Sequence, residues 1–177
     1  MSNKDFNELL KKLHELDNDI GKEVAMRAVK QGGMIVQSQA KLLITSDSGS
    51  LARSVRVKNE VKDDVISSTV YTKSPYAPYY EFGTGPNGQA NHDGISPRVT
   101  PRYSQRGWMI PADAMNEQKA RDYGFGIAMK DGKVIGYYTK GQMARPFMYP
   151  ALHDHKDDIQ KNTERLILRK LKEKCKE

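Results

Sequence analysis

The sequence predicts an α+β fold, in which an antiparallel sheet of about four strands packs against a long N-terminal helix and a C-terminal helix, with a long loop. Three observations lead to this prediction. Apolar residues recur at helical spacing at both ends of the chain, short stretches between them alternate apolar and polar residues, and one long stretch shows neither pattern. Because 177 residues suit one domain, we interpret residues 1–177 as a single domain.

The N-terminal helix is predicted over residues 1–45, with Ser2 or Asn3 as its cap. Gly32 and Gly33 interrupt its pattern, and a glycine inside a helix costs about 1 kcal/mol relative to alanine. We therefore expect another element to approach the helix closely at this pair. The apolar stripe consists of Phe6, Leu9, Leu10, Leu13, Leu16, Ile20, Val24, Ala28, Ile35, Val36, Ala40 and Leu43.

Several short segments have the pattern of strands. Alternation around Val55 and Val57 predicts one strand, and a second is predicted over residues 65–72, after a polar turn. Residues 108–110 predict a short buried strand, and residues 125–129 and 133–138 predict a hairpin joined through Asp131-Gly132. Residues 112–121 can form a short helix. The C-terminal helix is predicted over residues 150–174, with an apolar stripe of Leu152, Ile159, Leu166, Ile167 and Leu171.

The densest aromatic segment of the chain covers residues 74–85. Pro75 and Pro78 suit the first turn of a helix, in which Tyr76 and Tyr80 share one face and Tyr79 and Phe82 another. Glu81 stands among these rings and needs a partner, for which Arg145 is one candidate. Two interpretations stay open: an aromatic plug packed on a sheet, or a contact between subunits, because tyrosine and arginine are enriched in interface cores.

Residues 83–107 predict a long flexible loop. Arg98, Arg102 and Arg106 recur every four residues within it, and no acidic residue occurs from Gly94 to Ala112. The prolines of this stretch argue against a helix. The partners of the arginines must therefore come from the folded body, from a neighbouring subunit or from DNA, and we favour carboxylates of a neighbouring subunit.

Charge, cysteine content and apolar patterning limit the classes of protein to which this chain can belong. The net charge of +7 favours acidic partners or nucleic acid without establishing DNA binding. Cys175 is the only cysteine, so an intrachain disulfide is impossible, which is typical of a reducing compartment. The start of the chain lacks the pattern of a secretory signal, and no apolar stretch is long enough to span a bilayer. We expect a soluble protein that is made in the cytoplasm.

Patterns for catalysis or cofactor binding were weak. Gly83, Gly85 and Gly88 match the spacing of a dinucleotide fingerprint, but Pro86 lies inside it and no strand precedes it, so we expect no cofactor. His153, Asp154, His155, Asp157 and Asp158, with His92-Asp93 as a distant addition, could ligate a metal, but acids in the first turn of a helix are explained by its dipole. No serine elbow occurs and Cys175 lies in a charged tail, so we expect no enzyme activity.

Three motifs together resemble a known family. They are residues 48–55 (SGSLARSV), residues 76–84 (YAPYYEFGT) and residues 144–152 (ARPFMYPAL). Their order and spacing are similar to those of the tail-component or neck family of long-tailed bacteriophages, the phage HK ninety-seven gp-ten-like family. The chain departs from the family pattern in residues 112–124 and in the length of residues 83–107.

The resemblance implies a structural virion protein at the head–tail junction, which acts in tail completion or head–tail joining and carries out no catalysis. With it we expect other neck or tail proteins as partners, a homo-oligomeric ring in the virion whose subunit can be a monomer when free, and a location in the virion after a stage in the cytoplasm of a bacterial host. The alternative is a basic nucleic-acid-binding protein or assembly chaperone that uses the arginines and the basic last helix. Phe147 either anchors that helix to the sheet or is an interface residue. The predicted interface set is Tyr76, Tyr79, Tyr80, Glu81, Phe82, Arg98, Arg102, Arg106, Arg145 and Phe147.

Overall fold

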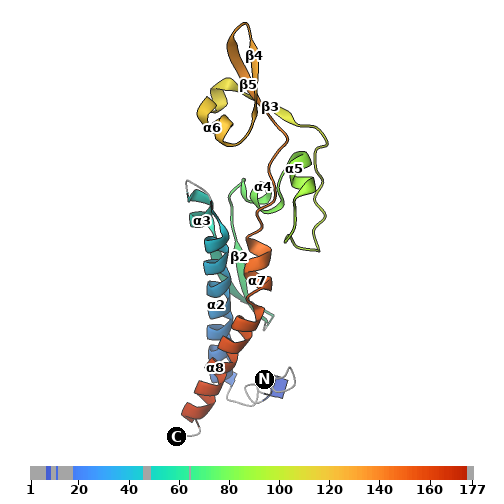
Figure 1. Cartoon of the computed structure of the whole chain (residues 1–177). Coiled ribbons are helices and arrows are strands. Elements are labelled where there is room, and N and C mark those ends of the chain that lie inside the picture. Colours follow the sequence, from blue (N-terminus) through green and yellow to red (C-terminus); the bar gives the residue numbers. More distant parts are fainter. Residues whose placement is uncertain (1–6, 9–10, 12–17, 46–48, 64, 175–177) are drawn as a thin grey trace. The chain divides into compact units, whose positions relative to one another are not determined.

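The computed structural model of the chain confirms the α+β class (Figure 1). The structure describes residues 7–8, 11, 18–45, 49–63 and 65–174. Most of the predicted helix before Asn18, with its cap and its first leucines, lies outside the described residues, as does Cys175. The chain divides into two compact units: residues 1–74 with 147–177, and residues 75–146. We call them unit 1 and unit 2.

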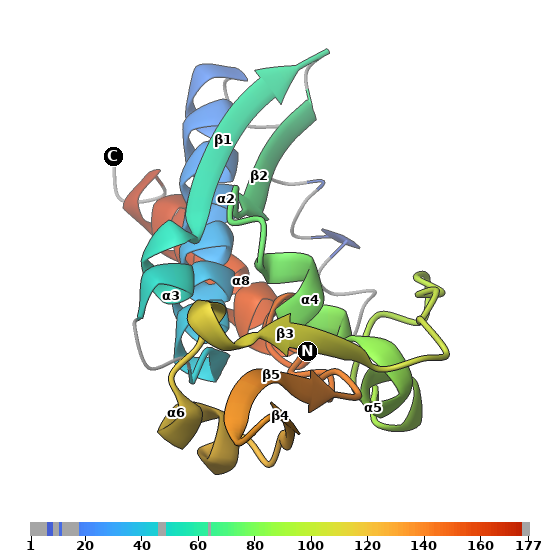
Figure 2. The same ribbon diagram turned by 90° about the horizontal axis from the view of Figure 1, so that it is seen from above.

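Unit 1 is built around α2 (Asn18–Leu43), which packs against a hairpin and against the C-terminal helices (Figures 1 and 2). The short helix α3 (Ser50–Ser54) leads into β1 (Arg56–Lys62), which pairs antiparallel with β2 (Val65–Tyr71). The pairing runs from Arg56 opposite Tyr71 to Lys62 opposite Val65. The two predicted strands are therefore confirmed, and a short helix precedes the first of them.

The buried face of α2 repeats every four residues. Val24, Ala28, Val36 and Ala40 are buried in this row, and Gly32 occupies the place between them. Leu43 was predicted to belong to the apolar stripe, but it is 42% exposed at the end of the helix. The row of small and β-branched side chains allows strands and helices to pack close to the helix axis.

The glycine pair of α2 permits this close packing. A Cβ atom on Gly33 would collide with Ser68 Oγ of β2, and one on Gly32 would lie 3.0 Å from Ile159 Cγ2. The expected close approach is thus confirmed, and it involves both the hairpin and the C-terminal helix. The glycines replace a side-chain layer with direct contact between the helix backbone and its neighbours.

The C-terminal helix was predicted as one element over residues 150–174, and this prediction was wrong in its continuity. The structure has α7 (Met148–His153) and α8 (Lys156–Lys174), separated by a turn at Asp154-His155. His155 Nδ1 lies 3.4 Å from Asp158 Oδ2, and the carbonyl of His155 accepts the N–H of Ile159. Asp154 follows α7 directly, and aspartate disfavours a helix interior because its side chain competes for backbone hydrogen bonds. Leu152, which was predicted to belong to the apolar stripe, is 55% exposed.

Unit 2 contains the short helices α4 (Ala77–Phe82) and α5 (Gly85–Ala90), then β3 (Trp108–Pro111), the 3₁₀ turn η1 (Ala112–Ala114), α6 (Glu117–Asp122), β4 (Gly126–Lys130) and β5 (Lys133–Thr139). The strands form an antiparallel sheet in the order β3-β5-β4. The predicted hairpin is confirmed, with positive φ at Asp131 and Gly132 as a tight turn requires. The predicted helix at 112–121 is split into η1 and α6.

The strands of the described chain do not form the one sheet of about four strands that was predicted. Five strands divide into a two-stranded and a three-stranded sheet, because β3 pairs with β5 and not with the hairpin of unit 1. Residues 108–110 were predicted to be buried, but Trp108 is 41% and Met109 is 51% exposed. None of the described helices is long and apolar enough to cross a membrane.

Replacing Gly33 by alanine should destabilise unit 1. Alanine at an open helix position stabilises by about 0.5–1 kcal/mol over glycine, but here the added methyl group collides with Ser68. We expect a loss of about 2 kcal/mol in the free energy of unfolding, measured by urea unfolding followed by circular dichroism. Gln31→Ala, at an exposed position of the same helix, is the control. A Gly33→Ala variant that is more stable than the parent would contradict the close packing.

Candidate partner interface

Two stretches of unit 2 are joined backbone to backbone. Residues 79–91 include the end of α4 and all of α5, and residues 139–145 begin at the last residue of β5. The backbone N–H groups donate in both directions, which ties the two stretches together over several residues. The bonds are Thr84 N to Gln142 O (2.8 Å), Asn87 N to Lys140 O (3.1 Å), Ala144 N to Asn91 O (2.9 Å) and Arg145 N to Tyr80 O (2.8 Å).

Glycines make this close approach possible. A Cβ atom on Gly83 would lie 2.7 Å from Ala144 N, and one on Gly85 would lie 2.6 Å from Lys140 O. On Gly88 it would lie 3.1 Å from Gln142 O, and on Gly141 it would collide with the carbonyl of Thr84. We call these four glycines and the four backbone bonds the glycine junction. The spacing Gly83-x-Gly85-x-x-Gly88 therefore serves packing between two backbones, and a helix, not a strand, precedes it.

An aromatic surface lies beside the glycine junction. Tyr79 is 57% exposed, and it lines a surface hollow of about 530 Å³ together with Phe82, Arg102, Tyr103 and Trp108. We call this the aromatic hollow. Tyr76 is 73% exposed on the same short helical segment but does not line the hollow. The sequence indicated Tyr79, Phe82 and Arg102, and it missed Tyr103 and Trp108, whose only signal was their closeness to the arginines.

Tyr103 fixes one wall of the aromatic hollow. Its hydroxyl donates to the carbonyl of Phe82 at 2.8 Å, and its ring stacks on His92 with centroids 5.7 Å apart. Burial raises the pKa of the Tyr103 hydroxyl above its ordinary value, because the ionised form is poorly solvated there. Residues 83–107 were predicted to be one flexible loop, but they contain α5 and are anchored through Tyr103; the predicted mobility of the remainder stays a prediction.

The three arginines of residues 83–107 are exposed. Within the described part of the chain, Arg98, Arg102 and Arg106 make no ion pair. Arg145 differs, since its guanidinium lies 5.9 Å from the centre of the Tyr80 ring. Of the three loop arginines, only Arg102 lines the aromatic hollow. The guanidinium groups of Arg98, Arg102 and Arg106 are therefore available to a carboxylate or a phosphate of a partner.

Two residues of the predicted interface set are buried. Phe147 is fully buried in unit 1, which agrees with its expected role as an anchor of the C-terminal helices, and its side chain is not on the surface in this structure. Glu81 of unit 2 is 6% exposed. The predicted pairing of Glu81 with Arg145 stays a prediction. Neither side chain is therefore part of the exposed surface of its own unit.

The possible metal ligands do not gather into a site among the described residues. His153 Nδ1 lies 2.9 Å from Asp154 Oδ1, and His153 also stacks on Tyr149. His153 ends α7 and Asp157 lies in α8, with the turn at Asp154-His155 between them. In the part of the chain that the structure describes, no group of three or more histidine, cysteine or acidic side chains could hold a metal ion.

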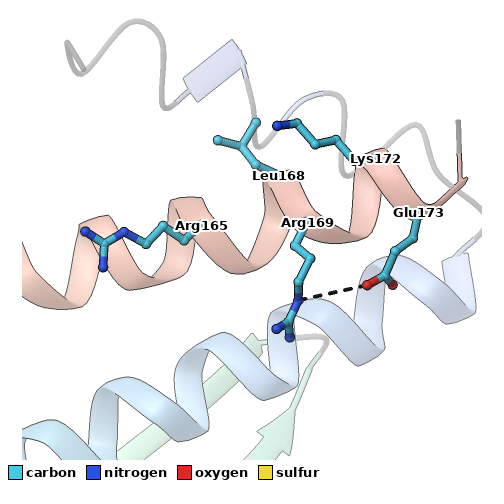
Figure 3. Close-up of a pocket in the computed structure, with 5 residues that line it drawn as sticks. All are labelled: Arg165, Leu168, Arg169, Lys172 and Glu173. Carbon is cyan, nitrogen blue, oxygen red and sulfur yellow. Dashed lines mark ion pairs between the residues drawn. The ribbon is translucent and has the colours of Figure 1, made fainter.

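A second charged surface lies on α8 (Figure 3). Arg165, Leu168, Arg169, Lys172 and Glu173 line a hollow of about 470 Å³, which we call the basic hollow. Arg169 Nε lies 4.0 Å from Glu173 Oε1. The pKa of Glu173 is lowered chiefly by a hydrogen bond from Lys170 Nζ, which lies 2.7 Å away. Arg165 and Lys172 make no ion pair with any described residue, so their charges are available to a phosphate group.

Comparison with known proteins gives a family for the first part of the chain. Residues 7–83 match the family model described as "Bacteriophage HK97-gp10, putative tail-component". The match confirms the predicted resemblance to this family over residues 7–83. No curated protein and no solved structure matches the chain.

The matched range ends at the first glycine of the glycine junction. It includes α2, the β1–β2 hairpin and α4, and so it includes Tyr79 and Phe82 of the aromatic hollow. The loop arginines, the sheet of unit 2 and the basic hollow lie beyond it, as does the motif at residues 144–152. The tail-component match therefore covers one wall of the aromatic hollow, while Arg102, Tyr103 and Trp108 come from the rest of the chain.

Replacing Gly85 by alanine should destabilise unit 2 more than replacing Gly124. Both glycines have positive φ, +61° and +68°, and an alanine in this region costs about 1–2 kcal/mol. Only at Gly85 would the methyl group also meet other atoms: it would lie 2.6 Å from Lys140 O and 3.0 Å from Trp108 Cζ3, whereas nothing lies within 4 Å at Gly124. We expect Gly85→Ala to cost about 2 kcal/mol more than Gly124→Ala.

Urea unfolding followed by the fluorescence of Trp108, the only tryptophan, measures this difference. Equal losses of stability in the two variants would contradict the proposed role of the glycine junction.

Proposed function

We propose that this protein is a structural component of the virion that acts at the head–tail junction of a long-tailed bacteriophage or prophage. In this proposal it works in tail completion or head–tail joining, by assembly into a ring with copies of itself and by contact with other neck or tail proteins. It is not an enzyme and needs no cofactor. The observation that carries the proposal is exposed Arg102, which lines the aromatic hollow and makes no ion pair among the described residues, in a chain whose first part matches a tail component.

The composition of this surface supports binding to another protein. Tyrosine, tryptophan and arginine dominate the energetics of protein interfaces, because they combine large contact areas with directed polar groups. Tyr79 and Trp108 expose such area, and Arg102 supplies a planar group that can bind a carboxylate in two places. The glycine junction and the hydrogen bond of Tyr103 hold the walls in place before a partner arrives, which reduces the entropic cost of binding.

Ring formation need not be strong in the free protein. A standard interface buries about 800 Å² on each partner, and contacts of this size can stay weak until several act together on a template. We therefore propose a subunit that is monomeric in solution and assembles on the virion. The arginines then contribute repeated charge-assisted contacts around the ring.

The triple substitution of Arg98, Arg102 and Arg106 by glutamine should block head–tail joining and leave the fold intact. The three side chains are exposed and make no ion pair with described residues, so the melting temperature should change little. Electron microscopy of a lysate that carries the variant should show separate heads and tails. A triple variant of Arg121, Lys130 and Lys133, which removes the same charge elsewhere in unit 2, should still give joined particles.

Two results would decide against this role. Joined and infectious particles with normal DNA ejection would show that the arginines have no role in assembly. Joined particles that eject DNA abnormally would instead assign the arginines to contacts with DNA in the lumen of the neck.

Nucleic-acid binding is the second candidate function, and the basic hollow of α8 is the observation that favours it. A protein that neutralises phosphates releases counterions, so its affinity falls steeply with salt, by a slope of about 0.9 for each phosphate contacted. Titration of duplex DNA at several salt concentrations tests this candidate. Tight binding by the free protein, with a slope that falls when Arg165, Arg169 and Lys172 are replaced by glutamine, would favour it over the assembly role.

A further inference from the structure

We infer that the aromatic hollow binds an extended acidic peptide segment of a neighbouring virion subunit. An apolar side chain of that segment fills the hollow, and an adjacent carboxylate pairs with Arg102. This inference rests on the proposed assembly function and specifies the chemistry of the partner at the same surface.

The walls of the hollow fit an apolar side chain. Pro78, Tyr79, Phe82, Pro101 and Trp108 all line it, and they offer ring faces and ring edges with few polar atoms. Its volume of about 530 Å³ lies within the range of roughly 300–1,000 Å³ that is usual for ligand pockets. Proline and aromatic rings that line a groove are typical of sites that bind extended peptides.

The hollow exists before binding. The hydroxyl of Tyr103 holds the segment before β3 against the end of α4, through its bond to the carbonyl of Phe82. Gln142 also attaches the segment after β5 to α4, because its side-chain amide donates to the carbonyl of Tyr79 at 2.9 Å. A partner segment therefore meets a formed site, and binding does not require these walls to become ordered.

Charge selects an acidic partner. Arg102 lines the hollow, Arg98 and Arg106 stand four residues before and after it in sequence, and no acidic residue occurs between Asp93 and Asp113. Because none of the three makes an ion pair within the described residues, a carboxylate from outside does not have to displace an internal one. A guanidinium and a carboxylate form paired, charge-assisted hydrogen bonds, which add direction as well as energy.

A second hollow can bind a further part of the partner's peptide segment. It has a volume of about 400 Å³ and includes Ile95, Pro97 and Val99 in its lining. Pro101 and Tyr103 line both hollows, so the two hollows are adjacent. An extended chain can therefore reach both of them, whereas a compact ligand would occupy one hollow only.

Duplex DNA is less complementary to this surface than an acidic peptide is. Its backbone presents phosphates to arginines, but it has no projecting apolar group that would enter a hollow lined by Tyr79, Phe82 and Trp108. The combination of arginine with an apolar hollow is therefore better matched by acidic and apolar side chains of one peptide chain.

The test titrates the full chain with a synthetic peptide and follows the fluorescence of Trp108, the only tryptophan. The probe is the capped nonapeptide Gly-Glu-Asp-Phe-Pro-Asp-Glu-Phe-Gly. One comparison peptide carries lysine in place of each acid, and another carries glycine in place of each phenylalanine. A duplex and a single-stranded oligonucleotide are titrated in the same way. We expect saturable binding of the acidic probe, and binding at least about tenfold weaker for both comparison peptides.

Variants connect this binding to the hollow. Arg102→Gln and Tyr79→Ala should each weaken binding of the probe about tenfold. Arg121→Gln and Tyr123→Ala change an exposed arginine and an exposed tyrosine of unit 2 that do not line the aromatic hollow, and they should leave the affinity unchanged. Near-ultraviolet circular dichroism checks that each variant keeps the parent fold.

The inference is overturned if the acidic probe does not bind at millimolar concentration, if the lysine peptide binds equally well, or if Arg102→Gln has no effect. It is also overturned if an oligonucleotide, and not the probe, shows binding that depends on Arg102. These outcomes are separate from the fate of the assembly role. Loss of head–tail joining in the triple arginine variant, together with no peptide binding, would leave the assembly function in place and reject only the acidic segment.

Discussion

The backbone hydrogen bonds between residues 79–91 and 139–145 are the constraint on which unit 2 depends. Each bond requires two backbones to approach without intervening side chains, and Gly83, Gly85, Gly88 and Gly141 stand where a Cβ atom would prevent this. The junction joins the two short helices to the end of β5, and hence to the three-stranded sheet. Because α4 and α5 have only six residues each, they are too short to be stable alone, and the junction supplies the missing stabilisation.

The surface proposed for partner binding follows from this junction. Tyr79 and Phe82 project from a helix that the junction holds, and Tyr103 attaches the arginine-containing segment to the same place through the carbonyl of Phe82. Unit 1 uses a related device, since Gly32 and Gly33 allow β2 and α8 to approach the backbone of α2. In both units, glycines exchange local helix propensity for close contact. In unit 1 the close contact lies along a packed row of core residues, whereas in unit 2 it lies beside an exposed aromatic surface.

Much of the fold could be predicted because periodicity reports burial directly. Val24, Ala28, Val36 and Ala40 recur every four residues and are buried, and Asp131-Gly132 marked a tight turn that the structure contains. The break between α7 and α8 was missed because it lies at the polar residues Asp154 and His155, whose positions apolar spacing does not report. The separation into two sheets was missed because strand patterns carry no information on which strand pairs with which. Tyr79, Phe82 and Arg102 belong to the predicted interface set and line one hollow, which Tyr103 and Trp108, absent from that set, also line.

Amide hydrogen exchange of the free protein tests the central claim that the glycine junction holds this surface in place before a partner binds. The informative amides are those of Thr84, Asn87, Ala144 and Arg145, which lie outside the strands and donate across the junction. Our account predicts that they are protected to the same degree as the paired amides of β5. It also predicts that the amides within residues 93–98, of which Pro97 has none, exchange fast, since the structure gives this segment no element of helix or strand. Exchange of the four junction amides at the rate of residues 93–98 would show that the junction does not persist in solution, and would contradict the account.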